Sequence, residues 1–514
     1  MSKFLIGNTN RRQITPLVAA ILCSLTAAHS ASAATRYVSP TGKNTGPGTS
    51  RTAPWATIQY AAENSLAGDV VEIDKGTYEG AVDVKVSGKQ GSPIIFRGQG
   101  SETIISGAKL KPNAQAALVT IRNQSFINIE NLTITGLVST TADYTPIGVL
   151  ITDAASNVEI RDTRITGIAN NFVGDLCSSE KKNPKLANAH GLAVFGTNSS
   201  TSIKGVRIIR NQIDNLKLGC SEALVVNGNV EDWEISRNSV HDNDNIAIDA
   251  IGYEGVGGNG ANDIARDGII SYNEIYNISS LKNNSYKERS AGGIYCDGCA
   301  RVTIDGNTIR NSDYGIEIAS EHRNTNSTGI IVRNNIIYNN YFSGLSVGGY
   351  DDQRGGTTDS KFINNSFYNN GLDDDDAGEF QIQWYTKGNV FANNIAYTSS
   401  EKRVVSHVSS SAGVSFSNNL YYVNGTTAAK SRWRWNNKDV AGFDAFTKAV
   451  QEKTSTFADP LYVKAATAGT DLHVRTGSPA IDKGTAFSEA DVGELDRDEK
   501  KRLKGTLDIG AYEQ

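Results

Sequence analysis

The sequence predicts an all-β protein, a single-stranded right-handed parallel β-helix of about ten turns, and three observations support this fold class. A short Asn-centred motif recurs at roughly 30-residue intervals, each interval holds two or three runs of alternating apolar residues, and Gly or Asn separates the runs. Alternation with a period of two indicates β-strands, and Gly and Asn tolerate left-handed bends between them. Because such short strands are unsuited to hairpins, we expect each turn of a coil to pair with the next.

The repeated motif reads Asn, any residue, an apolar residue, any residue, Asn. Clear copies start at Asn211, Asn273, Asn307, Asn335 and Asn365, and degenerate copies start at Asn131, Asp162, Asn238, Asn394 and Asn419. We expect equivalent Asn side chains to stack into ladders in which each amide bonds to the next. One interval is longer than the others, and its extra stretch, from about Gly167 to Ala189, is interpreted as an inserted loop.

Two other repeat folds fit the sequence less well. Leucine-rich repeats need a Leu-rich consensus and a regular helical segment in each unit, and the sequence has neither. A β-propeller needs antiparallel blades of about 40 residues joined by hairpin turns. The β-helix therefore remains the predicted architecture.

Residues 1–34 have the pattern of an export signal. Lys3, Arg11 and Arg12 precede an apolar stretch, and Ala31-Ser-Ala33 matches a signal peptidase site. Since no later segment is long enough to span a membrane, we expect a secreted or periplasmic protein.

The charge balance limits the partners. The chain of 514 residues has a formal net charge of −5, and removal of the basic signal makes it more acidic. An acidic chain lacks the electrostatic footprint of a nucleic-acid-binding protein. We expect a monomer whose partner is an extracellular polysaccharide.

Four cysteines follow the signal, and an even number in an exported chain fits two disulfides. Cys177 with Cys220 would pin a loop. Cys296 with Cys299 would close a tight loop at the end of a strand.

The coil is expected to have a cap at each end. Residues 35–98 would form an N-terminal cap and the first turns, and 53–62 fits a short amphipathic helix over the open end. Residues 99–460 would form the β-helix itself. Residues 461–514 would form a C-terminal cap over the other end.

Motifs at both ends resemble a known family. The opening motifs are Tyr37-Val-Ser-Pro-Thr-Gly42, Trp55-Ala-Thr-Ile-Gln59, Gly68-Asp-Val-Val71 and Gly76-Thr-Tyr78. With the endings Ser478-Pro-Ala-Ile-Asp482 and Asp508-Ile-Gly-Ala-Tyr-Glu513, they resemble the pectate-lyase-like β-helix superfamily and, in particular, the family nine pectate lyases. The resemblance covers the whole chain after the signal and implies the fold, while many different enzymes share it.

Acidic residues fall at related positions of neighbouring turns. Outward side chains of equivalent strands lie about 4.8 Å apart from turn to turn. Alignment of the strands by their inward apolar pairs places Asn227, Asp249 and Asp297 in one outward column, with Glu317 one position aside on the next turn. Because neighbouring carboxylates repel, Ca²⁺, a basic side chain or a shared proton must offset them. We interpret this column as a functional site rather than a solvated acidic face.

β-Elimination of a uronate is the reaction that we favour from the sequence. In this reaction a base removes the C5 proton, and a cation neutralises the substrate carboxylate. Lys287 or Arg289, which precede the Asp297 strand, would be the base. Asp249, Glu254 and Asp297 would hold Ca²⁺. Family nine pectate lyases are similar in using a Lys base with an Asp-rich calcium site.

Hydrolysis by two carboxylates is the alternative reaction. Asp249 and Asp297 would be the acid and the nucleophile or base. Glu317 or Glu321 would substitute for either of them. An acidic cleft suits a neutral glycan better than a polyuronate unless a metal fills it.

A non-catalytic glycan-binding surface protein is the third possibility. Aromatic side chains stack on sugar rings, and the candidates are Tyr253, Tyr295, Tyr350, Trp384 and Tyr385. Further candidates are Asn227 and Arg354 for substrate binding, and His322 beside Glu321 for catalysis. The concentration of acids, His and Arg between 242 and 354 favours an enzyme, because plain binding needs fewer titratable groups.

Overall fold

The computed structural model describes residues 33–110, 116–258, 260–374, 376–409 and 413–514. The predicted export signal lies outside these residues apart from its last two. Within these ranges, no helix is long and apolar enough to cross a lipid bilayer.

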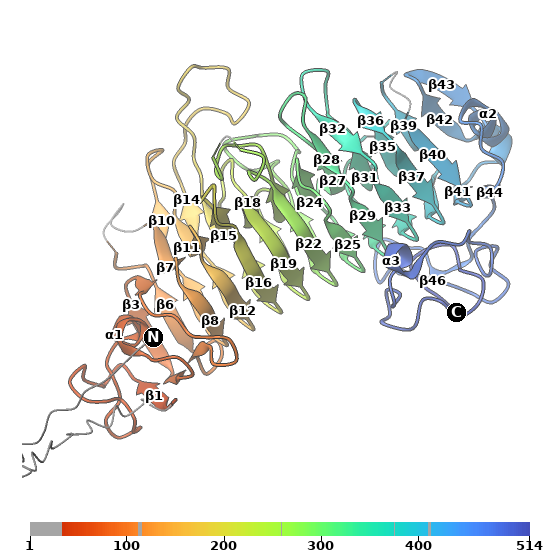
Figure 1. Ribbon diagram of the computed structural model, residues 1–514. Helices are drawn as coiled ribbons and strands as arrows, with labels where there is room; N and C mark the ends of the chain where they lie inside the picture. The colour runs from red at the N-terminus through yellow and green to blue at the C-terminus, as the bar shows by residue number, and fades with distance from the viewer. Residues whose placement is uncertain (1–32, 111–115, 259, 375, 410–412) are drawn as a thin grey trace, which may run out of the picture. The chain divides into compact units, whose positions relative to one another are not determined.

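The predicted right-handed parallel β-helix is confirmed. Three sheets of 13 strands each run along the coil, and each strand pairs in parallel with its equivalent in the next turn (Figure 1). A closing antiparallel hairpin in the third sheet is the exception. The sheets extend beyond the ten Asn repeats because strands that precede the first repeat belong to them as well.

We name the sheets A, B and C. Sheet A contains β1 (Thr35–Val38), β2 (Val70–Ile73), β5 (Ile94–Arg97), β8 (Ser125–Glu130), β12 (Ser156–Arg161), β16 (Ile203–Ile209), β19 (Val230–Ser236), β22 (Ala265–Ser271), β25 (Thr303–Asp305), β29 (Ile331–Arg333), β33 (Lys361–Ile363), β37 (Asn389–Ala392) and β40 (Val414–Ser417). Sheet B contains β3 (Gly76–Glu79), β6 (Thr103–Ser106), β9 (Thr133–Thr135), β13 (Arg164–Thr166), β17 (Gln212–Asp214), β20 (Ser239–Asn243), β23 (Glu274–Ile278), β26 (Thr308–Arg310), β30 (Ile336–Tyr338), β34 (Ser366–Tyr368), β38 (Ile395–Ser399), β41 (Leu420–Asn424) and β44 (Thr456–Phe457). Sheet C contains β4 (Val82–Val84), β7 (Ala117–Arg122), β11 (Ile147–Thr152), β15 (His190–Gly196), β18 (Leu224–Gly228), β21 (Ile248–Ile251), β24 (Gly292–Asp297), β27 (Tyr314–Ala319), β31 (Leu345–Val347), β35 (Phe380–Ile382), β39 (Arg403–His407), β42 (Arg432–Trp435) and β43 (Lys438–Ala441).

Smaller sheets edge the coil. They are β10 (Val138–Ser139) with β14 (Ala169–Asn170), β28 (Asn326–Thr328) with β32 (Gly356–Thr358) and β36 (Thr386–Lys387), and β45 (Tyr462–Lys464) with β46 (Asp471–Val474). The helices are α1 (Ile58–Asn64), α2 (Phe443–Ala449), α3 (Glu489–Val492) and the 3₁₀ turn Ala428–Lys430.

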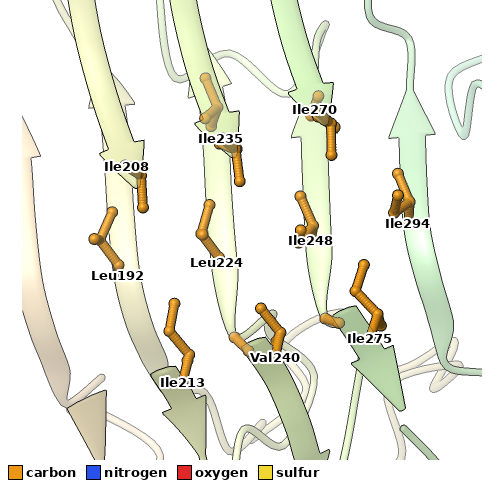
Figure 2. Close-up of a cluster of buried hydrophobic side chains, with 14 of the residues drawn as sticks. Leu192, Ile208, Ile213, Leu224, Ile235, Val240, Ile248, Ile270, Ile275 and Ile294 are labelled. Atoms are coloured by element: carbon orange, nitrogen blue, oxygen red, sulfur yellow. The ribbon is translucent and has the colours of Figure 1, made fainter. Parts of the chain in front are cut away.

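The core consists of aliphatic columns inside the coil. Leu192, Leu224, Ile248 and Ile294 follow one another in register along sheet C, and all four are fully buried. Equivalent columns from sheets A and B face them, as Figure 2 shows. Because burial of each such side chain contributes about 1.5–3 kcal/mol, the repeated inward residues hold successive turns together.

The predicted Asn ladder is confirmed along eight turns. Its members are Asn211, Asn238, Asn273, Asn307, Asn335, Asn365, Asn394 and Asn419, each accepting at its Oδ1 from the preceding member. The predicted ladder positions of two degenerate repeats, Asn131 and Asp162, are wrong by one residue. Thr163, not Asp162, takes the ladder position, and its N–H donates to Asn211 Oδ1 at 3.1 Å. Asp162 and Asn131 instead occupy a left-handed bend, which Asn and Asp adopt readily.

Replacing Asn335 with Ala is expected to destabilise the fold by about 3 kcal/mol or more. The Asn335 amide is fully buried, accepts from Asn307, and donates to the carbonyls of Ile304 and Arg333 and to Asn365. Each buried group left without a partner costs about 1–3 kcal/mol. Urea unfolding measures the loss. The exposed Asn284→Ala variant is the control, and equal unfolding midpoints for the two variants would contradict a stabilising role of the ladder.

A helix at the N-terminal end is confirmed, but α1 spans Ile58–Asn64 rather than 53–62, and it buries Ile58, Ala61 and Ala62 in the core. At the other end, Phe446 of α2 stacks on Trp433 of β42 with ring centroids 4.2 Å apart. These rings belong to the core cluster, so α2 and the β42–β43 hairpin close the coil.

The C-terminal residues that were predicted to close this end lie along its side instead. The side-chain amides of Asn334, Asn364 and Asn393, on three successive turns, donate to backbone carbonyls of Val492, Asp508 and Thr485. The Asn residues of the left-handed bends thus present a row of donors that the returning chain satisfies.

Both predicted disulfides are present, Cys177–Cys220 and Cys296–Cys299. The first ties the inserted loop between β14 and β15 to the turn before β18. Residues 171–189 contain no helix or strand, but β14 lies within the stretch from about Gly167 that was predicted to be loop. The second encloses Asp297, the last residue of β24.

Candidate active site

The acidic side chains gather on the outer face of sheet C, but in two columns rather than one. Asp249 of β21 pairs in register with Tyr295 of β24, which pairs with Glu317 of β27. The second column contains Asn227, Ile251 and Asp297. The prediction of a single column for Asn227, Asp249 and Asp297 is therefore wrong. Ile251, two residues after Asp249, takes the predicted position of Asp249.

The physical reason for this shift is the inward pair of β21. Ile248 and Ala250 point into the core, whereas the alignment had used Ile246 and Ile248. Ala250 is a small core residue and gives a weak apolar signal. A shift by two residues preserves the face, so Asp249 still points outward, beside Tyr295 and Glu317.

The site has a deep layer and a rim. Asp249, Asp297 and Tyr295 are only 2%, 3% and 4% exposed. Glu254 and Glu321, on the loops that follow β21 and β27, are exposed above them. The Asn227 amide donates to Glu254 Oε2 at 2.7 Å, and the Glu321 N–H donates to Asp297 Oδ1 at 2.6 Å.

Gly298 allows an aromatic side chain to approach the rim. Its φ is +71°, and a Cβ at this position would lie 2.7 Å from the ring of Tyr253. A larger residue after Asp297 would therefore displace Tyr253, whose own φ of +69° is unusual for a bulky residue. Such strained residues concentrate at functional sites.

Several buried polar atoms of the deep layer have no hydrogen-bond partner among the described residues. They are Asp249 Oδ1, Asn227 Oδ1 and the Tyr295 hydroxyl. Native proteins pair the large majority of such groups. These atoms are available to a polar ligand that reaches this layer.

The crowding of carboxyl groups raises their pKa values. Burial, with the charges of Glu222 and Asp297, raises the pKa of Asp249 well above its ordinary value. Burial and the Glu321 charge do the same for the pKa of Asp297, and they raise the pKa of Glu317 to about 8. Protons are therefore shared within the cluster at neutral pH.

Glu222 belongs to this cluster and was missed in the sequence. It precedes β18, and burial with the charge of Glu254 raises its pKa to about 8. Glu222 Oε2 lies 3.5 Å from Nδ1 of His190, a residue whose pKa burial lowers to about 4. Because Glu222 precedes the aligned strand, column alignment could not find it. Its position two residues before the inward Leu224 was the only available signal.

A second missed residue, Tyr286, approaches the cluster from the loop before β24. Burial raises its pKa to about 12, a hydrogen bond to Asn245 opposes this shift, and the charges of Glu222, Glu321 and Asp249 add to it. These interactions bring the loop between β23 and β24 next to the acids.

The two basic candidates lie differently from what the sequence suggested. Arg289 forms ion pairs with Asp313 at 3.0 Å and Asp373 at 2.5 Å, and its guanidinium lies over the Tyr341 ring. Burial lowers the pKa of Arg289, but the hydrogen bonds to Asp313 and Asp373, with the charges of both acids, raise this pKa by more. Because Asp313 is fully buried and needs a cation, Arg289 is engaged by this ion pair. Lys287 is exposed on the same loop.

The rim beyond Glu317 carries Tyr350, Arg354 and His322. Arg354 Nη1 donates to the Glu321 carbonyl at 3.4 Å, and the Arg354 guanidinium lies 4.7 Å from the Tyr350 ring centroid. Buried His322 Nε2 has no hydrogen-bond partner within the described ranges. These residues therefore adjoin the acids, as predicted.

Asp249, Glu254 and Asp297 offer the carboxylate oxygens that Ca²⁺ prefers. In the described part of the chain, however, no three His, Cys, Asp or Glu side chains are already arranged as a metal site. Calcium binding by this set stays a prediction.

Comparison with known proteins gives a relative that covers most of the chain, and it gives many likenesses of fold. No family model matches the chain. YwoF of Bacillus subtilis (strain 168), an uncharacterized protein, is 34% identical over 431 residues, which cover 83% of this chain and 88% of YwoF.

Solved structures resemble the chain at low sequence identity. The GH136 lacto-N-biosidase from Eubacterium ramulus has a TM-score of 0.52 at 13% identity, covering 76% of this chain and 68% of its own. The PL6 alginate lyase AlyGC has a TM-score of 0.50 at 13% identity, covering 88% and 56%. Pectate lyase Pel9A has a TM-score of 0.47 at 14% identity, covering 93% and 96%. The predicted resemblance to pectate-lyase-like β-helix proteins is confirmed at the level of fold.

Proposed function

The chain belongs to the family of YwoF from Bacillus subtilis, and we propose that it is an exported polysaccharide-degrading enzyme that cleaves glycosidic bonds with its carboxyl cluster. The main support for the proposal is the burial of acidic side chains in the deep layer. Asp249 and Asp297 lie buried beneath a rim, and an Asp249 oxygen has no partner among the described residues. An unpaired stack of acids costs stability unless a ligand or a reaction uses it.

Hydrolysis is the reaction that this geometry supports best. It needs one protonated carboxyl as the acid and one ionised carboxyl as the base or nucleophile. Glu317, with a pKa of about 8, holds its proton at neutral pH and suits the acid. Asp297 suits the second role because the hydrogen bond from the Glu321 N–H favours its ionised form, against the burial and the Glu321 charge that raise its pKa. Both residues face outward from adjacent strands, two positions apart along them.

Elimination of a uronate, favoured from the sequence, becomes the second candidate. Arg289 is committed to Asp313 and Asp373, which leaves Lys287 as the base. One observation favours this reaction: Lys287 follows Tyr286, which packs beside the acids. Protonated carboxyls would then bond to the substrate carboxylate, or Ca²⁺ would neutralise it.

One experiment separates these reactions. The protein is incubated with neutral glycans (xylan, galactan, arabinan) and with polygalacturonate and alginate, each with and without a chelator. We expect new reducing ends from a neutral glycan without new ultraviolet absorbance. Absorbance from a conjugated double bond would favour elimination, and its loss in chelator would support calcium. If no glycan is cleaved, the enzyme proposal fails, and retained binding would favour a glycan-binding protein.

A further inference from the structure

Two aromatic side chains stand out on the surface beside the acid cluster. Tyr350 is 41% exposed and Tyr385 is 43% exposed. Every other Tyr, Trp or Phe in the described part of the chain is more buried than these two. The exposed rings are thus confined to one place, on the loops that follow β31 and β35.

Both rings are held in place before any ligand arrives. The Tyr385 hydroxyl donates to the Asp352 carbonyl at 2.9 Å, which ties it to the loop of Tyr350. The guanidinium of Arg354 covers one face of the Tyr350 ring. Backbone hydrogen bonds join Gly349 to Trp384 at 2.9 and 3.0 Å, so the two loops form one unit. Such preorganisation reduces the entropy cost of binding.

The backbone of Tyr385 forms a left-handed bend. Its φ is +57°, a left-handed value that is unusual for a bulky residue. Gly356 makes room for this bend, since a Cβ there would lie 1.9 Å from the Tyr385 carbonyl oxygen. A glycine at position 385 would adopt the bend without strain but would present no ring.

These rings adjoin the acids. Arg354 contacts both the Tyr350 ring and the Glu321 carbonyl, and the pKa of Tyr350 is raised by burial and then by the charge of Glu321. The surface therefore continues from Glu321 to Tyr350 and on to Tyr385, along the axis of the coil.

We propose that Tyr350 and Tyr385 form a sugar-binding subsite that receives the C–H face of a pyranose ring next to the cleavage point. This inference rests on the proposed function, because that function identifies the ligand as a glycan. An apolar ring with a polar edge suits a sugar, because sugars combine a C–H face with hydroxyl groups. The substrate chain then runs along the coil axis, with the unit on the C-terminal side of the acids bound by these tyrosines.

Affinity electrophoresis tests the subsite independently of cleavage. The parent, the double variant Tyr350→Ala/Tyr385→Ala and the double variant Tyr350→Phe/Tyr385→Phe are run through native gels containing xylan, galactan or polygalacturonate. Val463→Ala, a similarly exposed apolar side chain on β45, is the control. We expect the Ala variant to lose affinity by about ten-fold or more and the Phe variant to retain most of it. Unchanged circular dichroism establishes that the Ala variant is folded.

The outcomes separate the subsite from the reaction. Equal retardation of the parent and the Ala variant overturns the subsite, even if the protein cleaves a glycan. A parent that no gel retards overturns it as well. Retardation lost only in the Ala variant supports the subsite, even if no product is ever formed and the enzyme proposal fails. If an unrelated protein, but no glycan, protects the two rings from chemical modification, the surface is a protein interface, and the subsite is wrong.

Discussion

Replacing Asp297 with Asn is expected to lower kcat/KM for glycan cleavage by about 10³-fold without unfolding the protein. The substitution keeps the shape of the side chain but removes the charge that the base or nucleophile needs. The hydrogen bond from the Glu321 N–H to this side chain becomes weaker. Because burial disfavours the ionised form of Asp297, removal of its charge is not expected to cost stability. Initial rates and thermal unfolding of the same preparation check both parts.

Two further variants make this result specific. Asp267→Asn changes the same residue type on sheet A, where Asp267 pairs with Arg301 at 2.6 Å, and should keep full activity. Glu317→Gln removes the proposed acid and should abolish the alkaline limb of the pH–rate profile. If Asp297→Asn retains the parental kcat/KM, Asp297 has no catalytic role, and the acid cluster needs another explanation.

The fold was predictable because its signals are local and repeated. Each Asn of the ladder lies beside a left-handed bend and two residues before an inward apolar residue, so a single turn reveals the pattern that all turns share. The two failures at Asn131 and Asp162 have the same origin. Asn and Asp serve both the ladder and the bend, and one residue separates these positions.

The site was predictable only in part, because it depends on register and on loops. Asp249 was assigned to the correct face but to the wrong column, since Ala250 is too small to mark the inward position. Glu222 and Tyr286 approach the acids from turns, where no periodic pattern exists. The ion pairs of Arg289 could not be predicted, because its partners, Asp313 and Asp373, are distant in the sequence. Long-range pairing of this kind leaves no trace in a single sequence.

The same cluster should make the fold less stable as the pH rises from about 5 to about 8. Glu222 and Glu317 have pKa values of about 8 in the folded protein, raised by burial and by neighbouring carboxylates, against an ordinary value of 4.5. Below 4.5 both groups are protonated in the folded and the unfolded chain, so pH has no effect through them. Between pH 4.5 and about 8, the unfolded chain releases protons from these two groups that the folded protein retains. Each pH unit then favours unfolding by on the order of 1 kcal/mol per group, and the loss is complete above pH 8.

Urea unfolding at pH 5, 6, 7 and 8 measures this slope. The double variant Glu222→Gln/Glu317→Gln should have a flatter profile than the parent, with the largest gain in stability at pH 8. Some slope will remain, because burial also raises the pKa of Glu379, outside the cluster, to about 7. Asn284→Ala carries no titratable group and should follow the parent. Parallel profiles of the parent and the double variant would show that both glutamates ionise freely in the folded protein. The shared protons on which the proposed acid depends would then be absent, so this equilibrium measurement tests the reaction without any substrate.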